Sequence, residues 1–383
     1  MASSDARLPS SLPGVQCQDH LPPPILRSAL AVQDVLNYII CVTSADLLVS
    51  FLRAVERELR SSLLRIGHPT LLAVAEHLCF GQTAKRARPR LVWQFGRCLG
   101  EAPCFDDLVD VAVAAELVHS SSLLHDDVID ESVLRRGRRS ANAAYGNPAA
   151  VLGGDMTLTL AMQRLEPHPR ELTTRVIGCV AQMTDAAISE IDARWRTDLD
   201  VEDWQRIASG KTAALLAWCG ESVATLAGDK DARAAFSACA RHLGIAFQLA
   251  DDLIDVGIEA GTLDEGKARY ADLRNGNANY AVIAAARRSE QVARWLAQLY
   301  DALRDPQAPA DERDLRVATV GDAVRSSLAT SAALGRVDHE LALALDALRA
   351  LSAAQEGYDA IAMWGRALCD RLHRPSTSRR KVV

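Results

Sequence analysis

The sequence predicts an all-α protein, and three observations support that prediction. Alanine and leucine dominate the chain, apolar residues recur with helical spacing over residues 111–124 and 243–254, and the alternating β-branched pattern of strands is scarce. A P-loop and a G-x-G-x-x-G after a strand are both missing from the sequence, so the common nucleotide-binding folds have no support. Ordinary helix and loop lengths then predict one domain of roughly ten to thirteen helices.

The elements follow in chain order. Residues 1–24 are rich in proline and predict a mobile arm, residues 25–373 form the helical domain, and residues 374–383 predict a mobile tail. The most apolar stretch, residues 30–52, contains Asp34, Asn37 and Asp46, so it predicts a buried or interface helix and no transmembrane segment. Loop residues gather near 81–89, 136–147, 167–169 and 256–279.

Composition narrows the possible partners and the compartment. The chain is 49% hydrophobic and 24% charged with a formal net charge of −6, so no overall positive field attracts nucleic acid. An anionic substrate would therefore need local basic groups or bound metal. The nine cysteines form no C-x-x-C pair and have no zinc-finger spacing. With no basic segment leading into an apolar run near the start, we expect a reduced, cytoplasmic protein.

Two aspartate clusters of one design are the strongest functional signal. In a helix, side chains at i and i+4 stand on one face, and the side chain at i+1 lies about 100° away beside them. Three carboxylates this close repel one another unless cations intervene. Hard carboxylate oxygens suit Mg²⁺, which is commonly shared with phosphate oxygens of a substrate. The alternative for either copy alone is a solvated helix face; two copies with apolar lead-ins favour a metal site. The clusters are Asp126, Asp127 and Asp130, and Asp251, Asp252 and Asp255.

Polar and basic residues near the clusters extend the same interpretation. Gln248 lies on the face of the second cluster, where its amide can order a carboxylate or water. Arginine and lysine bind phosphate oxygens well, although any one of them alone could be a surface group. Together, acids for metal and bases for phosphate predict a site for two polyanions. The basic residues are Lys85, Arg86 and Arg88 at a loop-to-helix junction, and Arg135 and Arg136 after the first cluster.

These motifs resemble those of the trans-isoprenyl diphosphate synthases, or polyprenyl synthetases. The resemblance covers roughly residues 80 to 285. ELVHSSSLLHDDVIDESVLRRGRRSAN, residues 116–142, is similar to the first aspartate-rich region of the family, and GIAFQLADDLID, residues 244–255, to the second. Lys85 with Arg88-Pro89, His119, Gly154-Asp155 and Lys211-Thr212 also match.

The resemblance implies an isoprenoid synthase helical bundle, a homodimer, with the two clusters facing each other across a central active-site cavity. It implies Mg²⁺ as cofactor, three ions with substrate bound: two on the first cluster and one on Asp251, with Asp252 and Asp255 nearby. Isopentenyl diphosphate and an allylic diphosphate are the implied substrates. Gln248 and Thr212 would line the reacting centre. The allylic diphosphate would contact Arg135, Lys211 and Lys267, and isopentenyl diphosphate would contact Lys85, Arg88, His119 and Arg136.

Two departures from the family pattern bear on function. In the loop after the second cluster, the family's second lysine is Asn277 and its threonine is Asn279, so one cation for the allylic diphosphate is missing. Bulky aromatics four and five residues before the first aspartate stop chain growth early in the family, but here Ser122 and Ser121 are small. The resemblance then implies a channel and a product of C20 or longer, unless a residue of another helix closes it.

The sequence therefore predicts a prenyltransferase that makes a linear trans-prenyl diphosphate. The alternatives are a diverged terpene cyclase or irregular prenyltransferase on the same scaffold, and a non-catalytic subunit of a heteromeric synthase. The second cluster and the basic candidates for the isopentenyl site favour condensation. Product length, preferred primer, the effect of the altered loop, partner subunits and pathway stay open.

Overall fold

The computed structural model describes residues 29–80, 85–135, 137–258, 269–351 and 353–373. Contacts divide the chain into two compact units, Met1–Leu47 and Leu48–Val383, and the site lies in the second. The predicted arm and tail, residues 1–24 and 374–383, fall outside the described residues, so these domain boundaries stay predictions.

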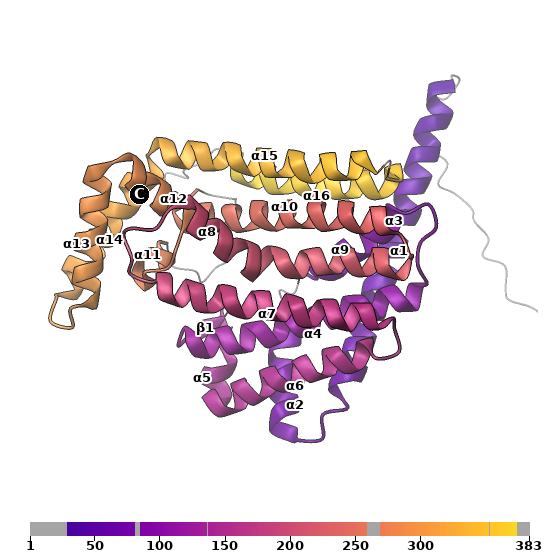
Figure 1. The fold of residues 1–383 in the computed structure, drawn as a ribbon, viewed down its shortest axis with the longest axis horizontal. Helices are drawn as coiled ribbons and strands as arrows, with labels where there is room; N and C mark the ends of the chain where they lie inside the picture. The colour runs from indigo at the N-terminus through magenta and orange to yellow at the C-terminus, as the bar shows by residue number, and fades with distance from the viewer. Residues whose placement is uncertain (1–28, 81–84, 136, 259–268, 352, 374–383) are drawn as a thin grey trace, which may run out of the picture. The chain divides into compact units, whose positions relative to one another are not determined.

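Helices make up nearly all of the described chain (Figure 1). The α-helices are α1 (Ala29–Leu63), α2 (Pro69–Cys79), α3 (Ala87–Arg97), α4 (Phe105–Ile129), α5 (Ala141–Tyr145), α6 (Asn147–Leu165), α7 (Arg170–Ala193), α8 (Val201–Ala208), α9 (Ala214–Leu226), α10 (Lys230–Asp255), α11 (Ala271–Asn275), α12 (Tyr280–Arg288), α13 (Glu290–Arg304), α14 (Ala310–Arg325), α15 (Leu328–Ala350) and α16 (Gln355–His373). A π-helical turn, η1 (Ser209–Ala213), joins α8 to α9, and strands β1 (Leu134–Arg135) and β2 (Arg138–Arg139) form a small antiparallel hairpin.

The all-α prediction is confirmed, but the number of helices was underestimated. The predicted loops at 136–147 and 256–279 contain the five-residue helices α5 and α11. Elements this short carry too few apolar positions to show a helical period. The predicted loop at 167–169 is confirmed as the turn between α6 and α7.

Two long helices carry the aspartate clusters and lie in the middle of the packing. α4 packs against α3, α6 and α9, and α10 packs against α9 and α15. Figure 1 shows α7, α9, α10 and α15 running side by side. Their facing sides and α3 form one large apolar core that includes the fully buried Trp218 of α9, Phe95 of α3 and Phe236 of α10. Since both clusters sit at helix ends that emerge from this core, packing of the core fixes where the carboxylates lie.

The length and composition of α4 would also suit a membrane-crossing helix, but its burial argues for another role. Of the most apolar stretch of this helix, 72% is buried inside the structure. That burial is typical of the central helix of a folded domain.

A second apolar cluster supports the loop that follows α10. Val256, Tyr270 and Leu273 pack with residues of α12, α13 and α14. The Tyr270 backbone lies in the left-handed region at φ 62°, and its hydroxyl donates a hydrogen bond to Asp322 Oδ1 at 2.7 Å. This cluster orients the short helix α11 against the end of the second aspartate cluster.

Arg86 connects the helices beneath the first cluster through buried ion pairs. The side chain is 7% exposed and donates to Glu56 Oε1 and Glu116 Oε2, both at 2.6 Å. A third bond goes to the Cys79 carbonyl oxygen at 2.8 Å. The guanidinium therefore joins α1, the end of α2 and α4 at the start of α3. Of the three cations predicted at this junction, Arg86 is thus a structural one.

Replacing Arg86 with alanine should destabilise the protein strongly. Removal of one partner leaves the buried Glu116 carboxylate uncompensated, which costs about 3–5 kcal/mol in the free energy of unfolding. Urea denaturation followed by circular dichroism measures the change. Arg90→Ala is the control, because Arg90 is exposed and its side chain donates to the Lys85 carbonyl oxygen, so the loss should stay within about 0.5 kcal/mol. Equal effects of the two substitutions would contradict the role of Arg86.

Candidate active site

The first cluster lies at the carboxyl end of α4, in a partly dry environment. Asp126 and Asp127 occupy the last turn and Asp130 caps the helix. The Asp127 side chain is fully buried, and its Oδ1 accepts a hydrogen bond from Arg135 Nε at 2.7 Å. The β1–β2 hairpin, in which Leu134 pairs with Arg139, presents Arg135 to this carboxylate.

Burial makes the charged form of these carboxylates costly. It raises the pKa of Asp126, with Lys211 opposing and Asp130 adding to the rise. It also raises the pKa of Asp127, although Arg135 acts in the opposite direction. A group that supplies positive charge at this helix end would relieve both.

The π-helical turn η1 brings Lys211 to the first cluster. Lys211 Nζ donates to Glu190 of α7, and its charge also interacts with Asp126. Burial would lower the pKa of Lys211, but Glu190 and Asp126 outweigh it and the pKa is raised. A β-carbon added at Gly210 would lie 2.5 Å from that of Ala186, so only glycine allows η1 this close to α7. Single-turn π-helices often occur at functional sites.

The neighbouring residue of η1 connects to the second cluster. Thr212 Oγ1 donates to Gln248 Oε1 at 2.8 Å, and Gln248 Nε2 donates to Asp252 Oδ1 at 3.0 Å. Through adjacent residues, η1 thus connects the two clusters, by the charge of Lys211 at Asp126 and by the hydrogen bonds from Thr212 through Gln248 to Asp252. The predicted ordering of a carboxylate by Gln248 is confirmed.

The three acids of the second cluster have different surroundings. Asp251 is exposed, whereas Asp252 and Asp255 are buried. Asp252 Oδ2 accepts from Trp204 Nε1 at 2.8 Å and from the Tyr280 amide at 2.7 Å. Burial raises the pKa of Asp252 well above its ordinary value, and Asp272 adds to the rise.

Asp255 is used by the backbone that follows the cluster. Its two carboxylate oxygens accept from the Ala271 and Asp272 amides, at 3.1 and 3.2 Å, at the start of α11. Asp252 and Asp255 thus have protein donors around them, and their part in metal binding stays a prediction. Asp251 is the acid of this cluster that faces solvent most openly.

Asn279, a departure from the family pattern, holds the loop to the cluster. It is fully buried, accepts from the Ala281 amide at 3.0 Å as the N-cap of α12, and donates to Asp272 Oδ2 at 2.9 Å. A second bond goes to the Asp252 carbonyl oxygen at 3.2 Å. The substitution therefore supplies both a cap and two donated bonds.

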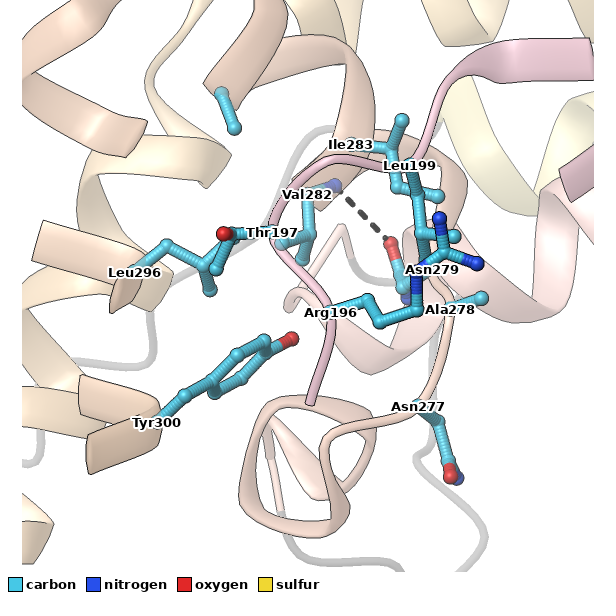
Figure 2. Close-up of a pocket in the computed structure, with 11 residues that line it drawn as sticks. Arg196, Thr197, Leu199, Asn277, Ala278, Asn279, Val282, Ile283, Leu296 and Tyr300 are labelled. Atoms are coloured by element: carbon cyan, nitrogen blue, oxygen red, sulfur yellow. Dashed lines mark hydrogen bonds between the residues drawn. The ribbon is translucent and has the colours of Figure 1, made fainter. Parts of the chain in front are cut away.

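A small pocket lies beside this loop, between residues 196–199 and α12 (Figure 2). Figure 2 shows Asn279 bonded to the Val282 amide and the Asn277 side chain pointing away from the other lining residues. The Asn277 amide instead contacts Arg194, which also binds Asp130 of the first cluster.

The residues predicted to bind isopentenyl diphosphate are only partly described. Lys85 is exposed just before α3, and Arg88 on α3 and His119 on α4 are half-buried on two helices that pack together. Arg136 of this set lies outside the described residues, as does Lys267, which is predicted to bind the allylic diphosphate. The binding roles of all five stay predictions.

The donor set fits magnesium. Asp127 Oδ2 is buried and has no hydrogen-bond partner among the described residues, which is rare for a carboxylate oxygen unless a cation binds there. Across all the residues that the structure describes, no group of three or more Asp, Glu, His or Cys side chains is arranged to hold a metal ion by itself. Mg²⁺ needs no such site, because it retains waters and takes phosphate oxygens beside one or two carboxylates.

Comparison with known proteins agrees with this geometry. The Polyprenyl synthetase family model matches residues 68–316. The chain belongs to the polyprenyl synthetase family. Both aspartate clusters, Lys211 and Gln248 lie within the matched residues, so the resemblance stated from the motifs is confirmed.

Curated relatives of this synthetase share its central region. A short chain isoprenyl diphosphate synthase of Methanothermobacter thermautotrophicus is 29% identical over 252 residues, covering 64% of this chain and 76% of the relative. A (2E,6E)-farnesyl diphosphate synthase of Mycobacterium tuberculosis is 36% identical over 196 residues, covering 50% of this chain and 54% of the relative. The match thus spans about half the length of the mycobacterial enzyme.

Solved structures agree over a greater length. A polyprenyl synthase from Caulobacter crescentus, complexed with calcium and isoprenyl diphosphate, superposes with a TM-score of 0.74 and 26% identity. The superposition covers 86% of this chain and 96% of that structure. The fold of the synthetase is therefore the all-α fold of prenyl synthases.

Sequence reasoning missed three residues of this site. Glu190 pairs with Lys211, Trp204 donates to Asp252, and Arg194 connects Asp130 with Asn277. These hydrogen-bonded partners are 21 to 83 positions apart in the sequence, which is too far for a local motif to mark them.

Asp126→Asn should raise the melting temperature of the metal-free protein at pH 7 by about 2 °C. Because folding raises the pKa of Asp126, the folded state disfavours the ionised carboxylate, and unfolding becomes easier as pH rises above about 3.9. Asparagine removes that cost, so the difference should vanish near pH 3. Differential scanning calorimetry in EDTA measures it.

Asp198→Asn is the matched control for this prediction. Arg196 holds the pKa of Asp198 below its ordinary value, so this substitution should lower the melting temperature slightly or leave it unchanged. A lower melting temperature for Asp126→Asn at pH 7 would contradict the prediction that the ionised Asp126 carboxylate destabilises the metal-free fold.

Proposed function

We propose that this chain is a Mg²⁺-dependent trans-prenyltransferase that condenses isopentenyl diphosphate with an allylic diphosphate into a linear prenyl diphosphate. The observation that carries the proposal is the bridge through η1: Lys211 at the first aspartate cluster and Thr212–Gln248 at the second. Two sets of carboxylates with a lysine between them suit a substrate whose diphosphate must be held and then released.

The protein residues have distinct parts in this reaction. Asp126, Asp127, Asp130 and Asp251 would hold the metal, with Asp252 and Asp255 beside them. When bound, Mg²⁺ stabilises the negative charge of the departing diphosphate. Arg135 and Lys211, which now pair with Asp127 and Glu190, would bind phosphate oxygens directly as preorganised positive charge.

The carbon chemistry needs orientation and exclusion of water. The allylic C–O bond breaks with its electron pair on the diphosphate, the isopentenyl double bond attacks the resulting carbocation, and a proton is lost from the adjacent carbon. The proton goes to the released diphosphate, since the aspartates hold metal. Thr212 and Gln248 would orient the reacting centre. Lys267 would contact the allylic diphosphate. The residues that would bind isopentenyl diphosphate are Lys85, Arg88, His119 and Arg136. The apolar core around α4 and α10 keeps water from the cation.

The Caulobacter synthase, complexed with calcium and isoprenyl diphosphate, supports the binding of a divalent cation and a diphosphate by this fold. We infer three Mg²⁺ ions with substrate bound, a homodimeric state and a cytoplasmic location. Light scattering after size exclusion tests the dimer; a mass of one chain would reject it.

An elongation assay tests the proposal directly. Purified protein with Mg²⁺, labelled isopentenyl diphosphate and dimethylallyl, geranyl, farnesyl or geranylgeranyl diphosphate should yield labelled linear prenyl diphosphates. Hydrocarbon or alcohol formed without isopentenyl diphosphate would instead support a cyclase. No turnover with any primer would support a non-catalytic subunit.

Asp126→Ala and Asp251→Ala should each lower kcat by about 10²-fold or more, because each removes a charged ligand of the transition state. Steady-state kinetics at saturating Mg²⁺ measures the loss. The matched control is Asp301→Ala on α13, an exposed aspartate outside both clusters that pairs with Arg304, and its kcat should stay near that of the unmodified protein. Near-normal activity of both cluster variants would refute the metal assignment.

We infer a product of C20 or longer. Ser121 and Ser122 are small and lie one turn before Asp126 on α4, with Val118 and Ala115 buried further along the helix. No bulky side chain of α4 itself therefore stands at the two positions that stop growth in the family.

Ser122→Phe should shorten the product by at least one isoprene unit, because the ring occupies space that the growing chain would use. Thin-layer or liquid chromatography of the dephosphorylated products measures the length. Ser122→Ala, which adds no bulk, should leave the length unchanged. An unaltered product distribution in the phenylalanine variant would place the end of the cavity elsewhere.

A further inference from the structure

Arg194 occupies the junction between the first cluster and the loop that follows the second. It caps the carboxyl end of α7, and its side chain is 22% exposed. Nη2 donates to Asp130 Oδ1, and Nε donates to Asn277 Oδ1 at 3.2 Å. One guanidinium thus connects residues 64 positions and 83 positions away in the sequence.

The backbone around Arg194 is held in place at some cost. Trp195 has φ 65°, a left-handed conformation that is unfavourable for a bulky residue, and its amide donates to the Gly276 carbonyl oxygen at 2.9 Å. A β-carbon at Gly276 would lie 2.4 Å from the Trp195 ring. Strain of this kind persists where the surroundings require one geometry, and here it directs Arg194 toward Asp130.

Arg194 completes a pattern in the first cluster. Arg135 donates to Asp127, Lys211 interacts with Asp126, and Arg194 donates to Asp130, so each acid faces its own cation. Arg135 and Lys211 are two of the residues proposed above to bind the allylic diphosphate. Arg194 stands in the same relation to the cluster, from a third element of the fold.

The charge balance explains what Arg194 does once substrate arrives. A metal ion on Asp130 would displace and repel the guanidinium, unless an anion bound at the same time. A diphosphate supplies that anion, and a guanidinium can bind two of its oxygens together. Asn277 suits this arrangement because its neutral amide accepts from Arg194, whereas a lysine there would place a second cation beside it.

We propose that Arg194 binds the allylic diphosphate as a further cationic ligand, beside Arg135, Lys211 and Lys267, and supplies from α7 the positive charge that is absent at position 277. This role rests on the proposed function. It also accounts for the altered loop, in which Asn277 became an acceptor for an arginine.

Binding and kinetics of Arg194→Gln test the proposal. Calorimetric titration of inorganic diphosphate with excess Mg²⁺ should show about 10- to 100-fold weaker binding, the range expected for loss of a charge-assisted hydrogen bond. KM for the allylic substrate should rise by a similar factor, while KM for isopentenyl diphosphate should change less than about threefold. Arg196→Gln is the matched control, since the exposed Arg196 pairs with Asp198 and with neither cluster among the described residues, and this variant should bind diphosphate normally.

A compensating substitution separates charge from structure. In the Arg194→Gln background, Asn277→Lys should recover most of the lost diphosphate affinity, because the lysine restores a cation at the same place. Unchanged diphosphate binding in Arg194→Gln, or equal loss for both substrates with no recovery by Asn277→Lys, would overturn the role of Arg194. These results are judged against elongation by the unmodified protein; absence of that elongation would overturn the proposed function itself.

Discussion

Carboxylates gathered at the end of a buried helix must be neutralised, and much of this structure serves that requirement. Asp126 and Asp127 lie near the end of α4, where neither side chain is fully exposed to solvent. Burial therefore raises the pKa of both carboxylates. The protein answers with cations from three different elements: Arg135 on a hairpin, Lys211 on a π-helical turn, and Arg194 at the end of α7. Burial of these carboxylates has an electrostatic cost, which metal and diphosphate would relieve in the proposed function.

The second cluster is arranged differently, although its sequence has the same design. Asp252 and Asp255 are buried and receive donors from Trp204, the Tyr280 amide and the start of α11. They stabilise the loop that follows α10. Asp251 alone of the three is exposed, so the two clusters are unequal in what they can offer a cation. One motif combines a candidate ligand with two residues that position the surrounding backbone.

The altered loop after α10 shows how a departure from a family pattern can be compensated by distant residues. Asn279 caps α12 and bonds the carbonyl oxygen of Asp252, and Asn277 accepts from Arg194. Neither role needs a lysine or threonine. The loop is therefore held by a network of its own, and the missing positive charge has a candidate source in α7.

The sequence by itself determined the helical class, both clusters and the partnership of Gln248 with the second, because these depend on periodicity and on spacing within one helix. It could not place Glu190, Arg194 or Trp204, since each gains its role from a partner far along the chain. The short helices α5 and α11 and the π-helical turn were also beyond it, because they contain too few residues to show a period. The inequality of the clusters was decided by tertiary structure alone: identical local spacing leaves Asp130 exposed and its counterpart Asp255 buried, because burial depends on which helices pack against each end.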